Sequence, residues 1–148
     1  MRVVIAEAGV EYRIASDRQI RTPEDAAKTA EETRNSDTEC MTVLCLDTKH
    51  GMRSADIITT GLMDASLVHP REVFRQAISK NAAAIVLVHN HPSGDPSPSA
   101  EDIRITKQLV EAGKIIDIKV IDHVILGRNG DGSMRFISMR ETNMVDFG

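Results

Sequence analysis

The most apolar stretch of this chain, residues 82–88 (AAAIVLV), stops abruptly at a histidine. A continuous apolar run of this length is typical of a β-strand that is buried on both faces. Residues 41–47 (MTVLCLD) form a second such run, which is also bounded by turn residues. Strands of this kind need a covering layer on each face of their sheet, so the two runs predict an α/β or mixed α+β fold around a central sheet.

The remaining segments alternate between helix and strand signals. Helices are expected over residues 23–34, from residue 69 onward and over residues 100–111, with Gly113 closing the last one. Strands are expected over residues 2–6, 11–14, 54–60, 115–126 and 134–138, while residues 61–68 stay open between strand and loop. The tail beyond residue 138 is expected to be loose.

The 148 residues show neither an internal repeat nor linker composition, so a single domain is expected over residues 1–148. Within it, residues 1–40 are expected to form an N-terminal extension with one helix. Residues 41–127 are expected to form the core that bears the motif.

Charge and composition argue against several functional classes. The formal net charge of -4 lacks the basic field that dominates nucleic-acid affinity. Aromatic residues are only 3% of the chain, which is too few for a platform that stacks single-stranded bases. No apolar run approaches membrane-spanning length, and the first one is too short for a signal peptide, so a cytoplasmic location is expected. Cys40 and Cys45 should point to opposite faces of a strand, as buried, reduced thiols.

The segment after residue 88 concentrates polar groups that could act together. His89 and His91 are two residues apart at a strand end, so their side chains should point to the same side. Pro92 then interrupts the strand, and the loop returns to Ser99 at a helix N-cap position. Asp102 falls in the first turn of that helix, where it can face the histidines.

Two imidazoles and one carboxylate form a donor set that suits zinc. Three protein ligands leave the fourth coordination position open, as in catalytic zinc sites, and such a site activates water at neutral pH. The site would lie at the carboxyl end of a central strand, where ligands gather in open α/β sheets. The alternatives are that Ser99 and Asp102 only cap the helix and that the two histidines are loop residues without a ligand.

The motif HNHPSG at residues 89–94, with Ser99 and Asp102, resembles the JAMM motif of JAB/MPN-type metalloproteases, and more narrowly their RadC-like branch. Residues 69–72 (HPRE), 81–83 (NAA) and 122–123 (DH) also resemble landmarks of that branch. The resemblance spans residues 41–127. It implies a JAB/MPN fold, similar to cytidine deaminases, with a curved mixed sheet flanked by helices. A helix-hairpin-helix segment, often fused N-terminally in this family, is not evident in residues 1–40.

The resemblance also implies roles for individual residues. His89, His91 and Asp102 match the zinc ligands, and Ser99 matches a residue that hydrogen-bonds water or the developing oxyanion. The family places a glutamate on an upstream strand as the general base. At that position this chain carries Asp56, which has suitable acid–base chemistry but a shorter reach.

Other residues are weaker candidates for a role at this site. Asp64 and Glu39 are alternatives to Asp56 as the base, and Asp56 could instead be an exposed strand residue. For His123 a structural role is favoured over a catalytic one.

These features are compatible with three functions. The leading one is a zinc-dependent hydrolase that acts on an amide bond of a protein or peptide substrate, as a peptidase or isopeptidase. The second is a non-catalytic interaction module that keeps the metal, or only the fold, which the aspartate at position 56 keeps open. The third is a metal-dependent enzyme associated with DNA repair, against which the acidic charge and the few aromatic residues weigh.

Overall fold

The computed structural model describes residues 2–7, 10–15, 18–33, 38–60 and 68–148. Five strands form the centre in the order β4-β3-β5-β6-β7, and the hairpin β1-β2 extends the sheet beyond β4. The strands are β1 (Arg2–Glu7), β2 (Val10–Ala15), β3 (Cys40–Leu46), β4 (Met52–Thr60), β5 (Ala84–Asn90), β6 (Lys119–Arg128) and β7 (Met134–Ser138). The helices are α1 (Pro23–Thr33), α2 (Pro70–Ser79) and α3 (Ala100–Ile116).

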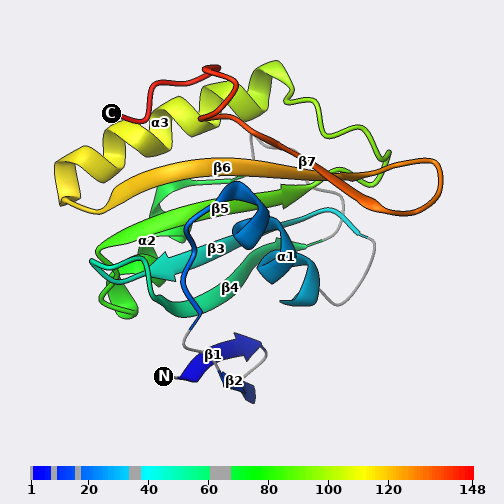
Figure 1. Cartoon of the computed structure of the whole chain (residues 1–148). Coiled ribbons are helices and arrows are strands. Elements are labelled where there is room, and N and C mark those ends of the chain that lie inside the picture. The colour runs from blue at the N-terminus through cyan, green and yellow to red at the C-terminus, as the bar shows by residue number, and fades with distance from the viewer. Residues whose placement is uncertain (1, 8–9, 16–17, 34–37, 61–67) are drawn as a thin grey trace.

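The helices cover the sheet in two layers (Figure 1). α1 packs on one face through Ala26, Ala27 and Ala30. α2 and α3 pack on the opposite face, where Phe74 and Leu109 belong to one buried cluster. This arrangement is the α/β fold, of the JAB/MPN type, that the apolar runs and the resemblance predicted.

Strands β3 and β5 lie at the centre of the sheet, and every residue in both is buried. They run antiparallel, with Met41 opposite His89. On the other side of β5, β6 runs parallel to it. Side chains alternate along β5, so Leu87 and His89 face α2 and α3 while Val86 and Val88 face α1.

The third helix and the C-terminal tail differ from the expectations. α3 continues past Gly113 to Ile116, and its C-cap is Asp117 in the left-handed region at φ 59°. Gly113 instead allows close packing, because a Cβ there would lie 2.4 Å from the carbonyl oxygen of Ile118. The tail is not loose: Val145 and Phe147 are buried in the cluster beneath α2 and α3.

Other expectations fall on parts that the structure leaves undescribed. Whether residues 61–68 form a strand or a loop lies outside the described residues, except at Val68. The expected end of the first helix at Arg34 also lies outside them. Among the residues that are described, no helix combines the length and the apolar character needed to cross a membrane.

The loop after β5 touches the end of β6 at a pair of glycines. The amide of Arg128 donates to the carbonyl oxygen of Gly94 at 2.8 Å. Gly94 has φ +94°, a conformation that side chains disfavour. A Cβ on Gly127 would lie 2.1 Å from the Gly94 carbonyl oxygen, so this contact requires glycine there.

Gly127→Ala is therefore expected to destabilise the domain by about 1–3 kcal/mol, the usual cost of overpacking. The free energy of unfolding in urea measures this effect. Gly130→Ala is the matched control, because a Cβ at Gly130 meets nothing within 4 Å. Equal stability of the two variants would contradict the close contact.

Candidate metal centre

The structure brings together four of the predicted site residues, His89, His91, Ser99 and Asp102. His89 lies at the end of β5 with a side chain that is 1% exposed. His91 follows in the loop, and its amide donates to the carbonyl oxygen of Leu126 at 2.8 Å, which keeps the segment beside β6 after the ladder ends. The two imidazole rings meet edge to face with centroids 4.7 Å apart.

The turn after β5 orients the His91 ring. Its Nδ1 lies 2.9 Å from the carbonyl oxygen of Asp95, which can only accept, so Nδ1 carries the proton. Nε2 of a neutral His91 therefore keeps its lone pair. An imidazole held by a backbone carbonyl in this way is the usual arrangement of a metal-binding histidine.

Ser99 and Asp102 join the start of α3 to this site. The Ser99 hydroxyl accepts from the Asp102 amide at 3.0 Å, and Asp102 Oδ2 accepts from the Ser99 amide at 2.8 Å. This reciprocal capping box satisfies two donors that the first turn of a helix would leave unpaired. Ser99 is thus the N-cap of α3, as expected.

The Asp102 carboxylate also faces both histidines. Oδ1 lies 3.5 Å from His89 Nδ1, and Oδ2 lies 3.3 Å from His91 Nε2. Burial alone would raise the pKa of Asp102, but the interaction with His91, the Ser99 amide and the charge of His89 outweigh it and bring this pKa below its ordinary value. In turn, Asp102 raises the pKa of His91 although burial opposes that shift. The buried carboxylate therefore stays ionised.

Glu39 approaches the histidines from the start of β3. Its Oε1 lies 2.7 Å from His89 Nε2, and its side chain is 24% exposed. Glu39 precedes Met41 by two residues, so strand alternation directs both side chains to the face that carries His89. Glu39 was only a secondary candidate from the sequence, which placed it in the N-terminal extension.

The position of Asp56 does not match its expected role as the base. Asp56 on β4 lies opposite Val43 on β3, and Val43 lies opposite Leu87 on β5. Asp56 is therefore level with Leu87 and separated from β5 by the whole of β3. At about 4.8 Å per strand, the two strands alone separate it from β5 by about 10 Å.

The carboxylate of Asp56 has partners of its own. Its Oδ2 accepts from the Ser54 hydroxyl at 2.7 Å and lies 3.9 Å from Cys45 Sγ. Burial raises the pKa of Asp56, and the Ser54 hydrogen bond only partly opposes this shift. Asp56 is thus a buried sheet residue rather than an exposed one. The other alternative, Asp64, lies outside the described residues.

His123 lies behind His89 on β6 and is fully buried. The Thr106 hydroxyl donates to the Asp102 carbonyl oxygen at 2.6 Å and lies 2.6 Å from His123 Nδ1. Since the hydroxyl has one proton, it accepts from His123 Nδ1–H. Burial lowers the pKa of His123 to about 3, and the charge of His89 adds to this shift. His123 is therefore a neutral support beneath the site.

The donor atoms of this cluster fit a metal ion. Glu39, His89 and His91 form a group whose ligand atoms lie within 4.8 Å of one another. Nδ1 of His89 is buried without a hydrogen-bond partner in the described part of the chain, which suits a lone pair reserved for a metal.

Asp102 lies close to both histidines. Ligands about 2.05 Å from a tetrahedral ion lie roughly 3.3 Å apart. The distances from Asp102 to the histidines are of this size, but they involve Oδ1 for His89 and Oδ2 for His91. The Glu39 contact of 2.7 Å is shorter and has the length of a hydrogen bond. The candidate metal-binding group of the described residues is thus Glu39, His89 and His91, and Asp102 lies beside both histidines.

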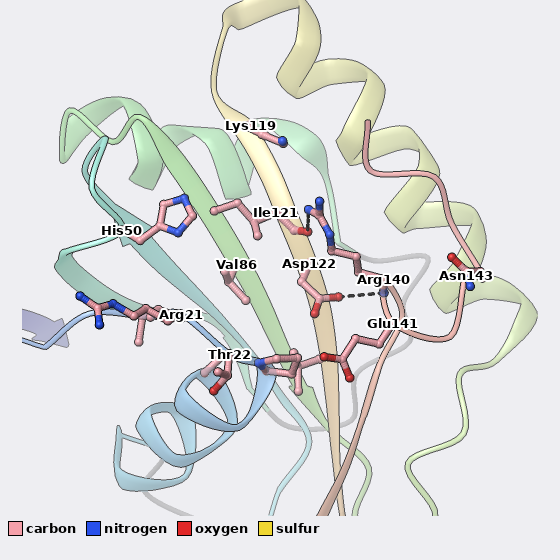
Figure 2. Close-up of a pocket in the computed structure, with 14 residues that line it drawn as sticks. Arg21, Thr22, His50, Val86, Lys119, Ile121, Asp122, Arg140, Glu141 and Asn143 are labelled. Atoms are coloured by element: carbon pink, nitrogen blue, oxygen red, sulfur yellow. Dashed lines mark hydrogen bonds between the residues drawn. The ribbon is translucent and has the colours of Figure 1, made fainter.

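One cavity lies beside the carboxyl ends of β5 and β6, and another lies on the face of the sheet that α1 covers. A cavity of about 250 Å³ adjoins the site and is lined by Glu31, Asn90, His91, Pro92, Leu126, Gly127 and Arg128. A larger cavity of about 530 Å³ lies on the face that α1 covers (Figure 2). In this cavity the backbone amide of Arg140 donates a hydrogen bond to the Asp122 carboxylate, and its guanidinium donates one to the Ile121 carbonyl oxygen. The larger cavity therefore does not contain the histidine cluster.

The fold and this cluster define an α/β domain with a candidate metal centre of two histidines and carboxylates at a strand end. A family model described as a RadC-like JAB domain matches residues 20–144. The chain therefore belongs to the RadC-like JAB domain family.

Bacterial relatives agree with this assignment. The UPF0758 protein of Alkaliphilus metalliredigens (strain QYMF) is 51% identical over 128 residues, which are 86% of this chain and 53% of that protein. The UPF0758 protein of Roseiflexus castenholzii (strain DSM 13941 / HLO8) is 47% identical over the same shares of the two chains. That of Caldanaerobacter subterraneus subsp. tengcongensis is 44% identical over 99% of this chain and 58% of its own. The chain thus spans about half the length of these relatives.

Ser99→Ala should remove the side-chain half of the capping box and destabilise the domain by about 1 kcal/mol. Urea unfolding measures this change. Ser97→Ala is the control, because Ser97 is exposed and its contacts with Asp95, through the backbone amide and the side chain, lie outside the capping box of α3. Equal stability of the two variants would contradict the cap.

His123 should make the metal-free protein less stable in acid. The unfolded chain protonates a histidine near pH 6.5, whereas native His123 stays neutral to about pH 3. Its contribution to stability is therefore complete above pH 6.5 and is lost as the pH falls toward 3, by at most about 1.4 kcal/mol per pH unit.

Urea unfolding between pH 7 and pH 4 tests this dependence on His123. His123→Gln should lower the slope of stability against pH in this window, while His69→Gln, at an exposed histidine, should not. An unchanged slope in His123→Gln would show that His123 is not the group responsible.

Proposed function

We propose that this domain is a zinc-dependent hydrolase that cleaves a peptide or isopeptide bond. The observation that carries the proposal is the placement of Asp102, at 3.5 and 3.3 Å from His89 and His91. Membership of a JAB domain family supports this class of chemistry. The amide substrate itself rests on the resemblance to JAMM-motif metalloproteases.

In this proposal His89, His91 and Asp102 hold the zinc ion. When bound, the ion supplies a Lewis acid that lowers the pKa of water and polarises a carbonyl group. The capping box keeps the Asp102 carboxylate turned toward the histidines, and its lowered pKa keeps it ionised. The Asp95 carbonyl holds His91 in the tautomer that presents Nε2.

Glu39 takes the role of general base in place of Asp56. It borders the histidines and remains partly exposed, so a water molecule and a substrate can reach it. Its carboxylate would accept a proton from the attacking water and return it to the leaving amine nitrogen. Asp56 is too distant for this transfer, since it lies two strands from β5.

Ser99 is placed to assist through its hydroxyl. The oxygen already accepts the Asp102 amide, which leaves the hydroxyl proton available for donation. Donation to the oxyanion that forms at the substrate carbonyl would stabilise it.

The interaction module without catalysis loses its main support. It was kept open by an aspartate standing where the family has a glutamate. Glu39, directly before β3 and 2.7 Å from His89, offers another candidate base, which favours the enzyme in this proposal.

Zinc loading and hydrolysis test the proposal together. The purified chain is expected to bind one zinc ion, released by chelator or by acid as the histidines protonate. Glu39→Gln should keep zinc and lose hydrolysis by roughly 10²–10⁴-fold, because it cannot accept a proton. Asp102→Asn should lose zinc, and Asp56→Asn should change neither property by this mechanism.

The measurements are elemental analysis of each variant and assays with peptide, isopeptide-linked and DNA substrates, with and without chelator. A chain that binds no zinc when zinc is supplied contradicts the proposal. Zinc binding without cleavage of any substrate favours the interaction module, and chelator-sensitive cleavage of DNA alone favours the DNA-associated enzyme. Loss of zinc in Glu39→Gln, with zinc retained in Asp102→Asn, would make Glu39 a ligand.

A further inference from the structure

Glu39 lies beyond the backbone hydrogen bonds that hold β3 against β5. The register of these two strands begins at Met41, opposite His89. Cys40 pairs with Thr60 of β4 on the other side. The strand pairing therefore does not by itself fix Glu39, although its carboxylate must lie close to His89.

The Asn90 side chain occupies the place where that pairing stops. Its Oδ1 accepts from the Cys40 amide at 2.8 Å, and its Nδ2 donates to the Thr38 carbonyl oxygen at 3.0 Å. These two backbone groups belong to the residues on either side of Glu39. Asn90 is 4% exposed, so its hydrogen bond to Cys40 forms away from water, while the one to Thr38 is partly buried.

Strand alternation separates Asn90 from the ligand positions. Its neighbours His89 and His91 project toward α3, whereas Asn90 follows Val86 and Val88 toward the face that α1 covers. Asn90 therefore acts on Glu39 through the backbone of β3 rather than by touching the histidines' face.

We propose that Asn90 is the positioning residue for Glu39, and this rests on the proposed function of Glu39 as the base. A primary amide carries a donor and an acceptor on one planar group, so one side chain can hold both Thr38 and Cys40. Asn90 thereby extends the junction between β5 and β3 past Met41. The residue between the two histidines links the ligand-bearing strand to the base-bearing strand.

The first test uses the metal-free chain and needs no activity. In Asn90→Ala, the Cys40 amide should exchange with solvent about fivefold faster or more, since a buried hydrogen bond is lost. The ¹⁵N signal of His89 Nε2 should also shift, because its contact with Glu39 loosens. Cys40→Ala is the matched control: it removes the thiol, 3.2 Å from the same Asn90 oxygen, and keeps both backbone contacts.

The second test is a double-mutant cycle on the zinc-loaded chain. Asn90→Ala should lower kcat by about 10²-fold, as a displaced catalytic group does, with zinc affinity and KM little changed. In the Glu39→Gln background the same substitution should have almost no further effect on kcat, because the group it positions is already inactive. A merely structural role would lower activity equally in both backgrounds.

Either an unaltered Cys40 exchange rate and His89 signal in Asn90→Ala, or equal kcat losses in the two backgrounds, overturns the proposal. If Asn90→Ala does not fold, Asn90→Asp replaces it. This variant keeps an acceptor for Cys40 but cannot donate to Thr38, so the His89 signal should shift while Cys40 stays protected. An inactive wild-type chain would refute the proposed function alone, since exchange and the ¹⁵N signal still decide whether Asn90 holds Glu39.

Discussion

The candidate site depends on the contacts that the Asp102 carboxylate makes with Ser99 and with the two histidines. Through the capping box this carboxylate begins α3, and through its two oxygens it faces both histidines at the end of β5. One side chain thus joins a helix start to a strand end. A buried carboxylate without such partners would take up a proton. Here the surrounding donors hold its pKa below the ordinary value, so the charge that suits a metal is present in the folded chain.

The candidate site and the larger cavity lie on opposite faces of the sheet. The histidines, Asp102 and His123 gather on the side of α3, and His123 stays neutral beneath His89 because it is fully buried. The larger cavity lies across the sheet on the side of α1 (Figure 2). Asn90 connects the two sides, since it projects toward α1 while its amide holds the backbone around Glu39.

The contrast between Glu39 and Asp56 shows where inference from sequence ended. The first strand of the core was expected to begin at residue 41, which left Glu39 in an extension. β3 in fact begins at Cys40, directly after Glu39, and the Glu39 carboxylate lies 2.7 Å from His89 Nε2. Asp56 was expected as the base only because of the resemblance, and the order β4-β3-β5 puts a whole strand between it and the histidines.

Local patterns in the sequence determined the α/β class, the buried central strands, the paired histidines and the serine–aspartate start of the third helix. Each depends on residues near one another in the chain, through side-chain alternation, proline and capping. Tertiary structure alone decided that Glu39 meets His89 Nε2, that the helix runs past Gly113, and that Val145 and Phe147 enter the core. Those outcomes depend on strand order, register and space between layers, which arise from contacts between residues far apart in the chain.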